Sequence, residues 1–298
     1  MKNIFVFGSL NMDLAIRAPC IPRVGETMYG NGFMMNPGGK GANQAVACGK
    51  LGGRVFMGGC VGDDAFGKML LKALAGHNVS AAAVRVMPGV SSGVAMITVV
   101  DGDNRILLDA GANACAKKSD ADALLSRARK GDIFLTQLEN DAEITGYALA
   151  AAKKKGMFTI LNPAPASDAI IPWLSYVDII VPNETEYEYY TGMREIRVGG
   201  NVFFDAGIRR VVVTLGKKGY CCLTPTEIVC EDCVKAPVVD TTAAGDTFCG
   251  ALAVRLAVGD SLADALRYAN SAAALTVTRR GAQSSIPTCE EVSARFYL

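Results

Sequence analysis

Short apolar runs alternate with longer amphipathic segments along most of the chain. The apolar runs predict buried strands at residues 4–10, 54–59, 133–138, 157–162, 177–182 and 210–215. The longer segments predict helices at residues 64–76, 120–129, 141–155, 184–191, 245–258 and 262–278. Because strands that alternate with helices usually form a mostly parallel sheet covered on both faces, we expect a doubly wound α/β fold.

Two segments break this alternation, at residues 12–36 and 91–110. The first carries prolines and glycines between short apolar pieces, which is not a helical pattern. The second has a strand-like run on each side of Asp101-Gly102, and Asp-Gly in such a place is a strong hairpin signal. We therefore expect one domain over residues 1–298, with a small β-sheet that stands apart from the helices and acts as a lid.

The composition is that of an ordinary globular protein. Of the 298 residues, 50% are hydrophobic and 20% are charged, and the formal net charge is +1. No basic excess favours nucleic acid as a partner, and no apolar run is long enough to span a bilayer. The chain starts directly with a strand pattern rather than a signal peptide, so we expect a cytoplasmic protein. We expect its ten cysteines to be reduced thiols packed as small hydrophobic residues.

The stretch with the most chemical information is Asp-Thr-Thr-Ala-Ala-Gly-Asp-Thr-Phe-Cys-Gly, at residues 240–250. Small residues at a helix start leave backbone N–H groups open, and together with the helix dipole these form an anion site. An acid beside an anion site repels phosphate, but it suits a base that takes a proton from an incoming hydroxyl. Asp246 is that acid. On local sequence alone, a helix cap explains it equally well.

A glycine-rich turn precedes another helical run at residues 36–44, Asn-Pro-Gly-Gly-Lys-Gly-Ala-Asn-Gln. Its spacing is neither that of a P-loop nor that of a dinucleotide fingerprint, which disfavours a nicotinamide oxidoreductase. Glycines let a backbone approach a ligand closely, and Lys40 and Asn43 offer hydrogen-bond donors. A plain strand-to-helix turn is the competing explanation.

Polar residues follow several of the predicted strands. Because ligands bind at the carboxyl ends of strands in open α/β sheets, a crevice along that edge would collect these side chains. They are Asn11, Asp13, Gln137, Glu139, Asn162, Asn183, Glu186 and the residues 214–219, which we call the 214–219 loop. Turns for Asn11 and Asp13, and helix capping for Asn183 and Glu186, are the alternatives.

Three motifs in order make the chain resemble the ribokinase-like (pfkB-type) carbohydrate kinases. They are Gly38-Gly39-Lys40-Gly41-Ala42-Asn43-Gln44, Asn183-Glu184-Thr185-Glu186 and Thr242-Ala-Ala-Gly-Asp-Thr-Phe248. The resemblance extends from residue 8 to about residue 287. Within the family it is greatest to the ribokinase branch, through Asn11-x-Asp13, Asn162-Pro-Ala-Pro165 and residues 279–283.

This resemblance implies ATP-dependent phosphorylation of the primary hydroxyl of ribose, with Mg²⁺ and a potassium-like activating cation. It implies that Asp246 is the base and that the N–H groups of Ala243, Ala244 and Gly245 form the anion hole. The residues implied to hold the sugar are Asn11, Asp13, Gly39, Lys40, Asn43, Glu139 and Asp246. Those implied to hold the nucleotide are Asn183, Thr214, Leu215, Gly216, Lys217, Gly219, Gly245 and Asn270. Those implied for the metal ions are Glu186, with Asn183, for magnesium and Asp240, Thr242, Thr276, Arg279, Gly281 and Ser285 for the monovalent cation.

The residues leave other functions open. One is a kinase for a related pentose or nucleoside, such as deoxyribose or adenosine, and another is a sugar-binding module without catalysis. The presence of both Asp246 and Gly245 argues against the second. The resemblance also implies a homodimer in which the lids pack together. Two features depart from the ribokinase pattern: the segment 193–208 is short, and Asn270 stands where close members often carry His.

Overall fold

The computed structural model describes residues 1–101 and 103–296, and its strands fall into two groups. The first group is β1 (Ile4–Phe7), β4 (Val55–Gly62), β5 (Val79–Met87), β8 (Ile133–Thr136), β9 (Phe158–Leu161), β10 (Ile179–Ile180), β11 (Arg210–Thr214), β12 (Tyr220–Leu223) and β13 (Ile228–Glu231). The second group is β2 (Asn11–Arg17), β3 (Asn31–Gly38), β6 (Gly93–Val100) and β7 (Asp103–Asp109). The helices are α1 (Lys40–Lys50), α2 (Ala65–Gly76), α3 (Lys118–Leu125), α4 (Ala142–Lys154), α5 (Glu184–Thr191), α6 (Ile196–Asp205), α7 (Ala244–Val258), α8 (Leu262–Thr276) and α9 (Cys289–Phe296).

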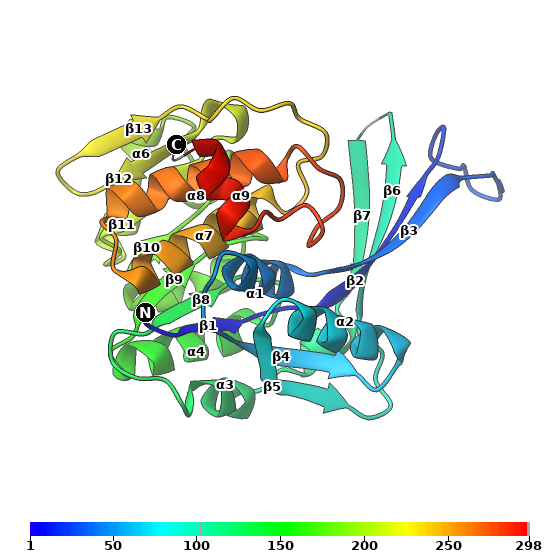
Figure 1. Ribbon diagram of the computed structural model, residues 1–298, viewed down its shortest axis with the longest axis horizontal. Helices are drawn as coiled ribbons and strands as arrows, with labels where there is room; N and C mark the ends of the chain where they lie inside the picture. Colours follow the sequence, from blue (N-terminus) through cyan, green and yellow to red (C-terminus); the bar gives the residue numbers. More distant parts are fainter. Residues whose placement is uncertain (102, 297–298) are drawn as a thin grey trace.

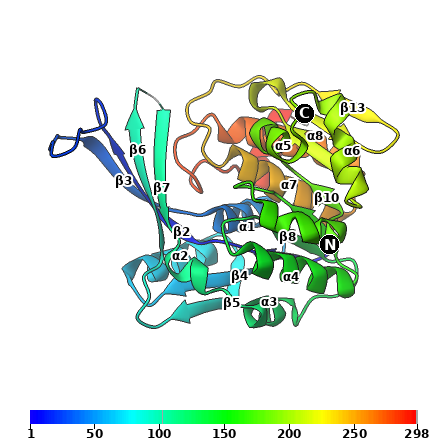
Figure 2. The same cartoon turned by 180° about the vertical axis from the view of Figure 1, so that it is seen from behind.

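The first group of strands forms one large sheet. Its order over the described residues is β13-β12-β11-β10-β9-β8-β1-β4-β5. All neighbours from β5 to β11 are parallel, and β12 and β13 join antiparallel at one edge. Strand residues alternate between two cores: Ile4 and Val6 pack with α1, α2, α7 and α8, whereas Phe5 and Phe7 pack with α3 to α6. The two opposite views show these helix layers on either side (Figures 1 and 2), which confirms the doubly wound fold.

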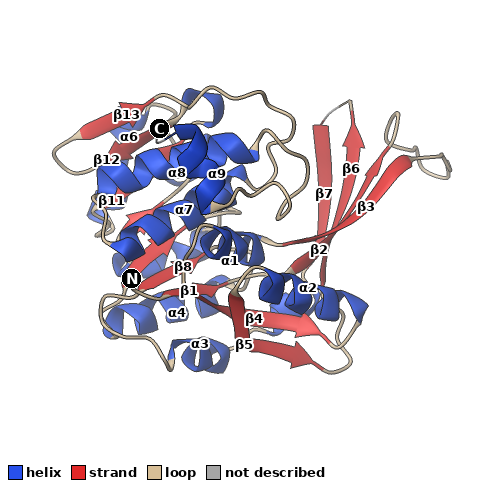
Figure 3. Cartoon of the chain, viewed as in Figure 1, coloured by secondary structure: helices blue, strands red, loops and turns tan. Residues whose placement is uncertain are grey.

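The second group forms the small sheet that the sequence predicts. Its order is β3-β2-β6-β7, and Figure 1 shows it projecting from the helical body. In Figure 3 its described residues are strands and loops. β6 and β7 pair antiparallel from Val94↔Asp109 to Val100↔Asp103, as the hairpin signal predicts, although Gly102 itself lies outside the described residues. Its function as a lid stays a prediction.

Every predicted strand and helix occurs, but several elements were not predicted. β5 contains three consecutive alanines, residues that favour helix, so its sequence carries little strand signal. α6 lies within the short 193–208 segment. Its helix signal is weak because it contains Gly199 and Gly200, and glycine disfavours helix. Within residues 1–101 and 103–296, every helix is too short or too polar to cross a membrane. The cytoplasmic location stays a prediction.

The expectation that all ten cysteines are free thiols is wrong for one pair. Cys221 and Cys230 form a disulfide between β12 and β13. They are direct partners in the antiparallel ladder, where opposite side chains come close enough to be bridged. Spacing along the chain does not reveal this pairing, because the hairpin that creates it was not predicted.

We expect this disulfide to be detectable by a thiol count. Denatured protein should react as eight thiols before reduction and as ten after it, because eight cysteines are free. The bond closes a loop of nine residues, so its reduction should cost about 2.5 kcal/mol of unfolding free energy in urea. Cys221→Ala should abolish this dependence on reductant, whereas Cys222→Ala, at the neighbouring free thiol, should leave it. Ten reactive thiols before reduction would contradict the assignment.

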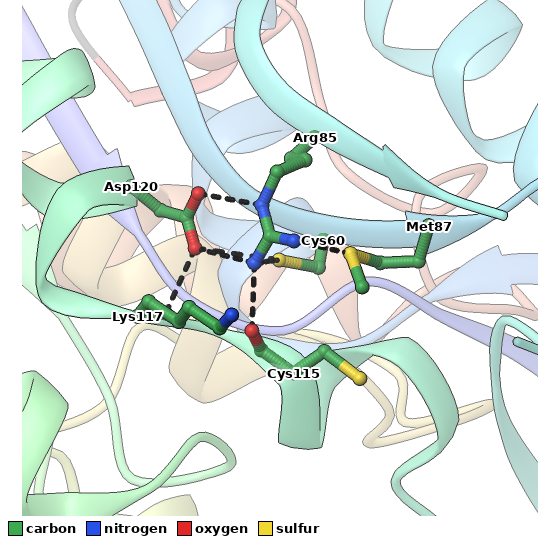
Figure 4. A network of polar contacts seen from close by, with 6 residues as sticks. All are labelled: Cys60, Arg85, Met87, Cys115, Lys117 and Asp120. Carbon is green, nitrogen blue, oxygen red and sulfur yellow. Dashed lines mark hydrogen bonds and ion pairs between the residues drawn. The ribbon is translucent and has the colours of Figure 1, made fainter.

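A polar cluster anchors the edge strand β5 to α3, and Figure 4 shows it in close-up. Arg85 donates to the two oxygens of Asp120 at 2.7 and 2.8 Å and to the carbonyl of Cys115 at 2.7 Å. Asp120 also accepts the N–H of Lys117 at 2.8 Å, at the start of α3. Burial would raise the pKa of Asp120, but the hydrogen bonds, led by that from Arg85, lower it instead. This ion pair therefore connects β5 to α3. It includes none of the predicted site residues.

Candidate active site

The predicted site residues lie where the order of the large sheet reverses. β1 is in the middle, paired with β4 on one side and β8 on the other. The chain after β8 carries Gln137 and Glu139, the chain after β9 carries Asn162, and Asn183 follows β10. These strands are parallel, so their carboxyl ends share one edge. Ligands bind at such a switch point in open α/β sheets.

Asp246 lies in the first turn of α7 and is 8% exposed. Its Oδ2 accepts a hydrogen bond from Asn43 Nδ2 at 3.1 Å, and its Oδ1 accepts one from Gln44 Nε2 at 3.0 Å. Both donors come from α1. The N-cap of α7 is Ala243, so Asp246 is not the cap that the local sequence left open. Its carboxylate is instead held by another helix.

The charges around Asp246 oppose one another. Burial raises the pKa of Asp246, while the charge of Lys40 and the hydrogen bonds of the two amides act against that rise. Burial would lower the pKa of Lys40, but the negative charges of Asp246, Glu139 and Glu186 outweigh it and raise that pKa. Lys40 therefore remains a cation among three carboxylates. The site thus combines a carboxylate whose pKa is raised with a half-buried positive charge.

Glu139 ties the glycine-rich turn to the end of β8. Its Oε2 accepts the N–H of Lys40 at 3.0 Å, the hydroxyl of Ser9 at 2.5 Å and Asn11 Nδ2 at 3.5 Å. The N-cap of α1 is Gly39, whose φ is +87°. A Cβ there would lie 2.7 Å from the backbone nitrogen of Asn11. Only glycine permits the backbone at residue 39 to come this close to Asn11. The carboxylate of Glu139 then accepts the first N–H of α1, that of Lys40.

Asn11 and Asp13 lie in β2, which shows that the turn explanation is wrong for them. Two residues apart on a strand, they point to the same face of the small sheet. Asp13 lines a cavity of 780 Å³ between that sheet and the segments 238–242 and 280–282. A Cβ on Gly38 would lie 2.2 Å from Asp13 Oδ2. The glycine therefore leaves the space that this carboxylate occupies.

Backbone N–H groups at the start of α7 are in part open. Ala243 has φ +60°, in the left-handed region. The N–H of Ala244 donates to the carbonyl of Thr241 at 3.3 Å. For the N–H of Gly245, no acceptor is found among residues 1–101 and 103–296, and a Cβ on Gly245 would meet no atom within 4 Å. The structure thus provides an unobstructed donor beside Asp246.

The predicted nucleotide residues gather at the neighbouring strand ends. Asn183 and Glu186 form a capping box at the start of α5, with bonds of 2.8 and 2.9 Å. Thr214, at the start of the 214–219 loop, pairs with Asn183 in an isolated parallel bridge. Asn270 donates from Nδ2 to the carbonyl of Asp232 at 2.8 Å. A Cβ on Gly219 would lie 2.6 Å from the carbonyl carbon of Asp232, so this loop packs beside Asn270.

Three of the residues predicted for the monovalent cation are in contact. Asp240 accepts the N–H and the hydroxyl of Thr242 at 2.9 and 2.6 Å, and the N–H of Gly281 at 3.0 Å. Burial would raise the pKa of Asp240, but these hydrogen bonds lower it, so the carboxylate is charged at neutral pH. The described part of the chain holds no cluster of three or more His, Cys, Asp or Glu side chains suited to a metal ion.

The side chains of the other three residues predicted for that cation have partners of their own. Thr276 donates its hydroxyl to the carbonyl of Ala272 at 3.0 Å and lies 3.0 Å from the hydroxyl of Thr247, and Ser285 donates to the carbonyl of Ala282 at 2.7 Å. Arg279 forms an ion pair with Glu291 at 2.7 Å. Arg279, whose side chain only donates, can therefore offer a cation just its backbone carbonyl, whereas the hydroxyl oxygens of Thr276 and Ser285 keep lone pairs that could coordinate one.

No local pattern identifies Gln44 as a functional residue, although it lies in the quoted glycine-rich motif. In the structure Gln44 contacts Asp246 directly and also binds Asn162 and Gln137. The available signal was its place next to Asn43 at the start of a helix. Its partners are 93 to 202 residues away in the chain, and no local pattern identifies them.

Comparison with known proteins gives similarity over the whole chain. A family model described as pfkB family carbohydrate kinase matches residues 1–289. A ribokinase of Schizosaccharomyces pombe is 40% identical over 314 residues, covering 100% of this chain and 99% of that protein. A deoxyribokinase of Salmonella typhimurium is 36% identical over 303 residues, covering 99% of each. The solved structure of Arabidopsis thaliana ribokinase complexed with ribose and ATP has a TM-score of 0.89 and 32% identity, covering 98% of each chain.

Proposed function

Because the chain belongs to the pfkB family of carbohydrate kinases, we propose that it transfers the terminal phosphoryl group of ATP to the primary 5-hydroxyl of D-ribose. One observation carries the proposal. The buried carboxylate of Asp246 lies in the first turn of α7, beside the open N–H of Gly245 and close enough to Asp13 for its charge to raise the pKa of Asp13. Base, anion donor and sugar-side acid are thus neighbours.

In this proposal Asp246 accepts the proton of the sugar hydroxyl as that oxygen attacks the phosphorus. Its raised pKa suits a base that must hold the proton briefly. The open N–H of Gly245, with that of Ala243, binds the oxygens on which charge accumulates, and the Lys40 cation adds to this stabilisation. The step is an in-line displacement without a covalent intermediate, so positioning and charge do most of the work.

The sugar hydroxyls are held by side chains that already have fixed orientations. Asn43 uses its Nδ2 on Asp246, which leaves its buried Oδ1 without a partner among the described residues. A buried acceptor of this kind is costly unless a ligand donates to it. We propose that this oxygen of Asn43 accepts a hydrogen bond from a sugar hydroxyl. The other proposed sugar ligands are Asn11, Asp13, Gly39, Lys40 and Glu139.

The nucleotide and ions belong on the other side of Asp246. We place the phosphates along Asn183 and the 214–219 loop, with Asn270 beyond them. Glu186 suits magnesium held through water, because its half-buried carboxylate interacts with both Lys40 and Asp246. When bound, magnesium neutralises phosphate charge. The charged carboxylate of Asp240, with the nearby backbone carbonyls, suits a potassium-like ion.

Sugar binding should depend on pH through Asp13. Burial, then the charges of Glu139 and Asp246, raises the pKa of Asp13 to about 7. A protonated Asp13 accepts fewer hydrogen bonds from a sugar, so the dissociation constant for ribose should rise about tenfold between pH 8 and pH 6. Calorimetry without ATP measures this without the chemical step. Asp13→Asn should bind weakly at both pH values, and an equal pH dependence in that variant would contradict the assignment.

The same group affects the stability of the unliganded protein in the opposite direction. The pKa of Asp13 in the folded protein is above its ordinary value of 3.8. Between about pH 4 and pH 7 the folded protein therefore keeps a proton that the unfolded chain releases. As the pH rises through this window, ionisation of Asp13 therefore lowers the free energy of unfolding of the unliganded protein. The same ionisation should strengthen the binding of the sugar.

A coupled assay of ADP release, with ATP and magnesium, tests the function. Ribose, deoxyribose, fructose and adenosine are compared, each with and without potassium. Ribose should give the highest kcat/KM, and potassium should raise it. Higher turnover of deoxyribose than of ribose would leave the proposed mechanism unchanged. It would identify deoxyribose as the preferred substrate, as the name of the deoxyribokinase relative suggests. Tight sugar binding without any turnover would overturn the kinase and leave a binding module.

We also propose a homodimer formed through the small sheet. On β7 the side chain of Leu107 is 76% exposed, and its direct cross-strand partner on β6, Met96, is 55% exposed. The two side chains share one face of the small sheet and form an apolar surface that a second copy would cover. Sedimentation equilibrium should give twice the mass of the chain. Leu107→Lys should shift the protein toward monomer, and a monomeric mass for the unmodified protein would contradict the proposal.

A further inference from the structure

Three amide side chains, two of them buried, connect the ends of β8 and β9 to Asp246. Gln44 is fully buried, Gln137 is 1% exposed, and Asn162 is half-buried. Gln44 donates from Nε2 to Asp246 Oδ1 at 3.0 Å and to Asn162 Oδ1 at 3.1 Å. Gln137 donates from Nε2 to Gln44 Oε1 at 2.5 Å, and Asn162 donates from Nδ2 to the carbonyl of Val181 at 2.9 Å. We call Gln44, Gln137 and Asn162 the amide relay.

The carbonyl of Val181, at the end of the amide relay remote from Asp246, fixes the direction of each hydrogen bond in the relay. The carbonyl of Val181 can only accept, so Asn162 must turn its NH₂ toward it and its oxygen toward Gln44. Gln44 must then donate to Asn162, and the second hydrogen of the same NH₂ reaches Asp246. The reverse orientation of Gln44 would place its oxygen against two acceptors. The carboxylate therefore meets a donor in the single orientation that the relay permits.

The amide relay is an expensive way to fill a core. Amides removed from water lose free energy unless all their hydrogen bonds are replaced, and Gln137 Oε1 is buried without a partner among the described residues. Apolar side chains of similar size would fill the same space without that cost. The relay ends on the one carboxylate to which the proposed reaction assigns a proton transfer.

We propose that Gln44 is a positioning residue for Asp246 and that Gln137 and Asn162 set its orientation. The inference rests on the proposed function, because it takes Asp246 as the base. Gln44 holds Oδ1 while Asn43 holds Oδ2, so the carboxylate cannot rotate away from the sugar hydroxyl. Neutral amides do this without a further cation that would weaken the base.

The charges near Asp246 make the bond from Gln44 important. Lys40 favours the ionised form of Asp246, whereas Glu139 disfavours it, and Glu186 and Asp13 are further negative groups that interact with it. Burial already raises the pKa of Asp246, and the bond from Gln44 is one of the effects that limit the rise. Its loss should raise this pKa further.

Gln44→Met tests the positioning role, since methionine has a similar length but donates no hydrogen bond. We expect kcat to fall about 10- to 100-fold, with KM for ribose changed less than about threefold, and the acid limb of the kcat profile to move to higher pH. Leu149→Ala, in the core on the opposite face of the sheet, is the control. It should lower the melting temperature without moving the pH profile. A Gln44→Met variant that behaves like this control would overturn the inference.

Two variants at Gln137, which does not touch Asp246, test the direction of the relay. Gln137→Met removes a donor but leaves Gln44 bound to Asn162 and Asp246, so kcat should fall only slightly. Gln137→Glu places a carboxylate against Gln44 Oε1 and favours the reversed amide, so kcat should fall much further. Equal kcat values for the two variants would show that the relay has no fixed direction.

A titration that needs no turnover separates this inference from the proposed function. The carboxyl ¹³C signal of Asp246 is identified by its loss in Asp246→Asn and is followed by NMR against pH in the unliganded protein. Gln44→Met should raise its pKa. If the unmodified protein phosphorylates no sugar but the titration shifts, the function fails and the contact stands. If it is an active kinase and neither this titration nor kcat changes in Gln44→Met, the relay alone is overturned.

Discussion

Asp246→Asn should lower kcat about a thousandfold, because the amide cannot accept the proton of the sugar hydroxyl. The variant also turns an NH₂ group toward Asn43 or Gln44, both of which are donors. Sugar binding should persist, since the other proposed sugar ligands are unchanged. Steady-state kinetics with ribose and calorimetry without ATP measure the two effects separately.

Asp260→Asn is the matched control for this substitution. Asp260 follows the same helix and forms an ion pair with Arg255 at 2.6 Å, at the end remote from the first turn. The same chemical change there should leave kcat unaltered. If Asp246→Asn kept kcat within about tenfold of the unmodified protein, Asp246 would not be the base, and the proposed mechanism would have to be abandoned.

Gly245→Ala should lower kcat about 100- to 1,000-fold, because the methyl group would occupy the space in which the N–H meets the phosphoryl oxygens. The fold should tolerate the change. A Cβ at this position meets no atom within 4 Å, and alanine is the better helix former. The melting temperature should therefore stay the same or rise while activity falls. Kinetics and thermal unfolding of the same preparation test this combination.

Gly250→Ala, on the same helix, should show the opposite behaviour. A Cβ on Gly250 would lie 2.6 Å from the Cβ of Ala47 in α1, so packing must shift and the melting temperature should fall. Its kcat per folded molecule should change far less than that of Gly245→Ala. Full activity in Gly245→Ala would exclude this N–H group from the anion hole.

Local patterns were sufficient to predict most of the large sheet. Runs such as residues 133–138 and 210–215 are apolar because both faces of a parallel sheet are covered, and this property is visible in a few consecutive residues. Elements whose stability comes from distant partners were not predicted. β5 is an alanine-rich edge strand, and β13 is an edge strand whose one neighbour in the described sheet is its hairpin partner β12. Neither carries enough of its own signal.

Among the site residues, those in short motifs were identified and those held by remote contacts were not. The acid at Asp246 and the small residues before it are adjacent in the chain, so their shared chemistry could be read together. The roles of Gln44 and Gln137 depend on a hydrogen bond between residues 93 positions apart. Cys221 and Cys230 look like ordinary thiols until an antiparallel ladder makes them partners.

Local patterns in the chain were enough to establish the α/β class, most strand and helix segments and the residue types available for phosphoryl transfer. These depend on hydrophobic periodicity and on turn and cap chemistry, which act over a few residues. Three contacts became visible in the folded protein alone: α1 holds Asp246, Asp13 faces a cavity, and Gln44 connects the ends of β8 and β9 to the start of α7. Those contacts follow from the order in which strands pack in the sheet, and no local property of the chain contains that order.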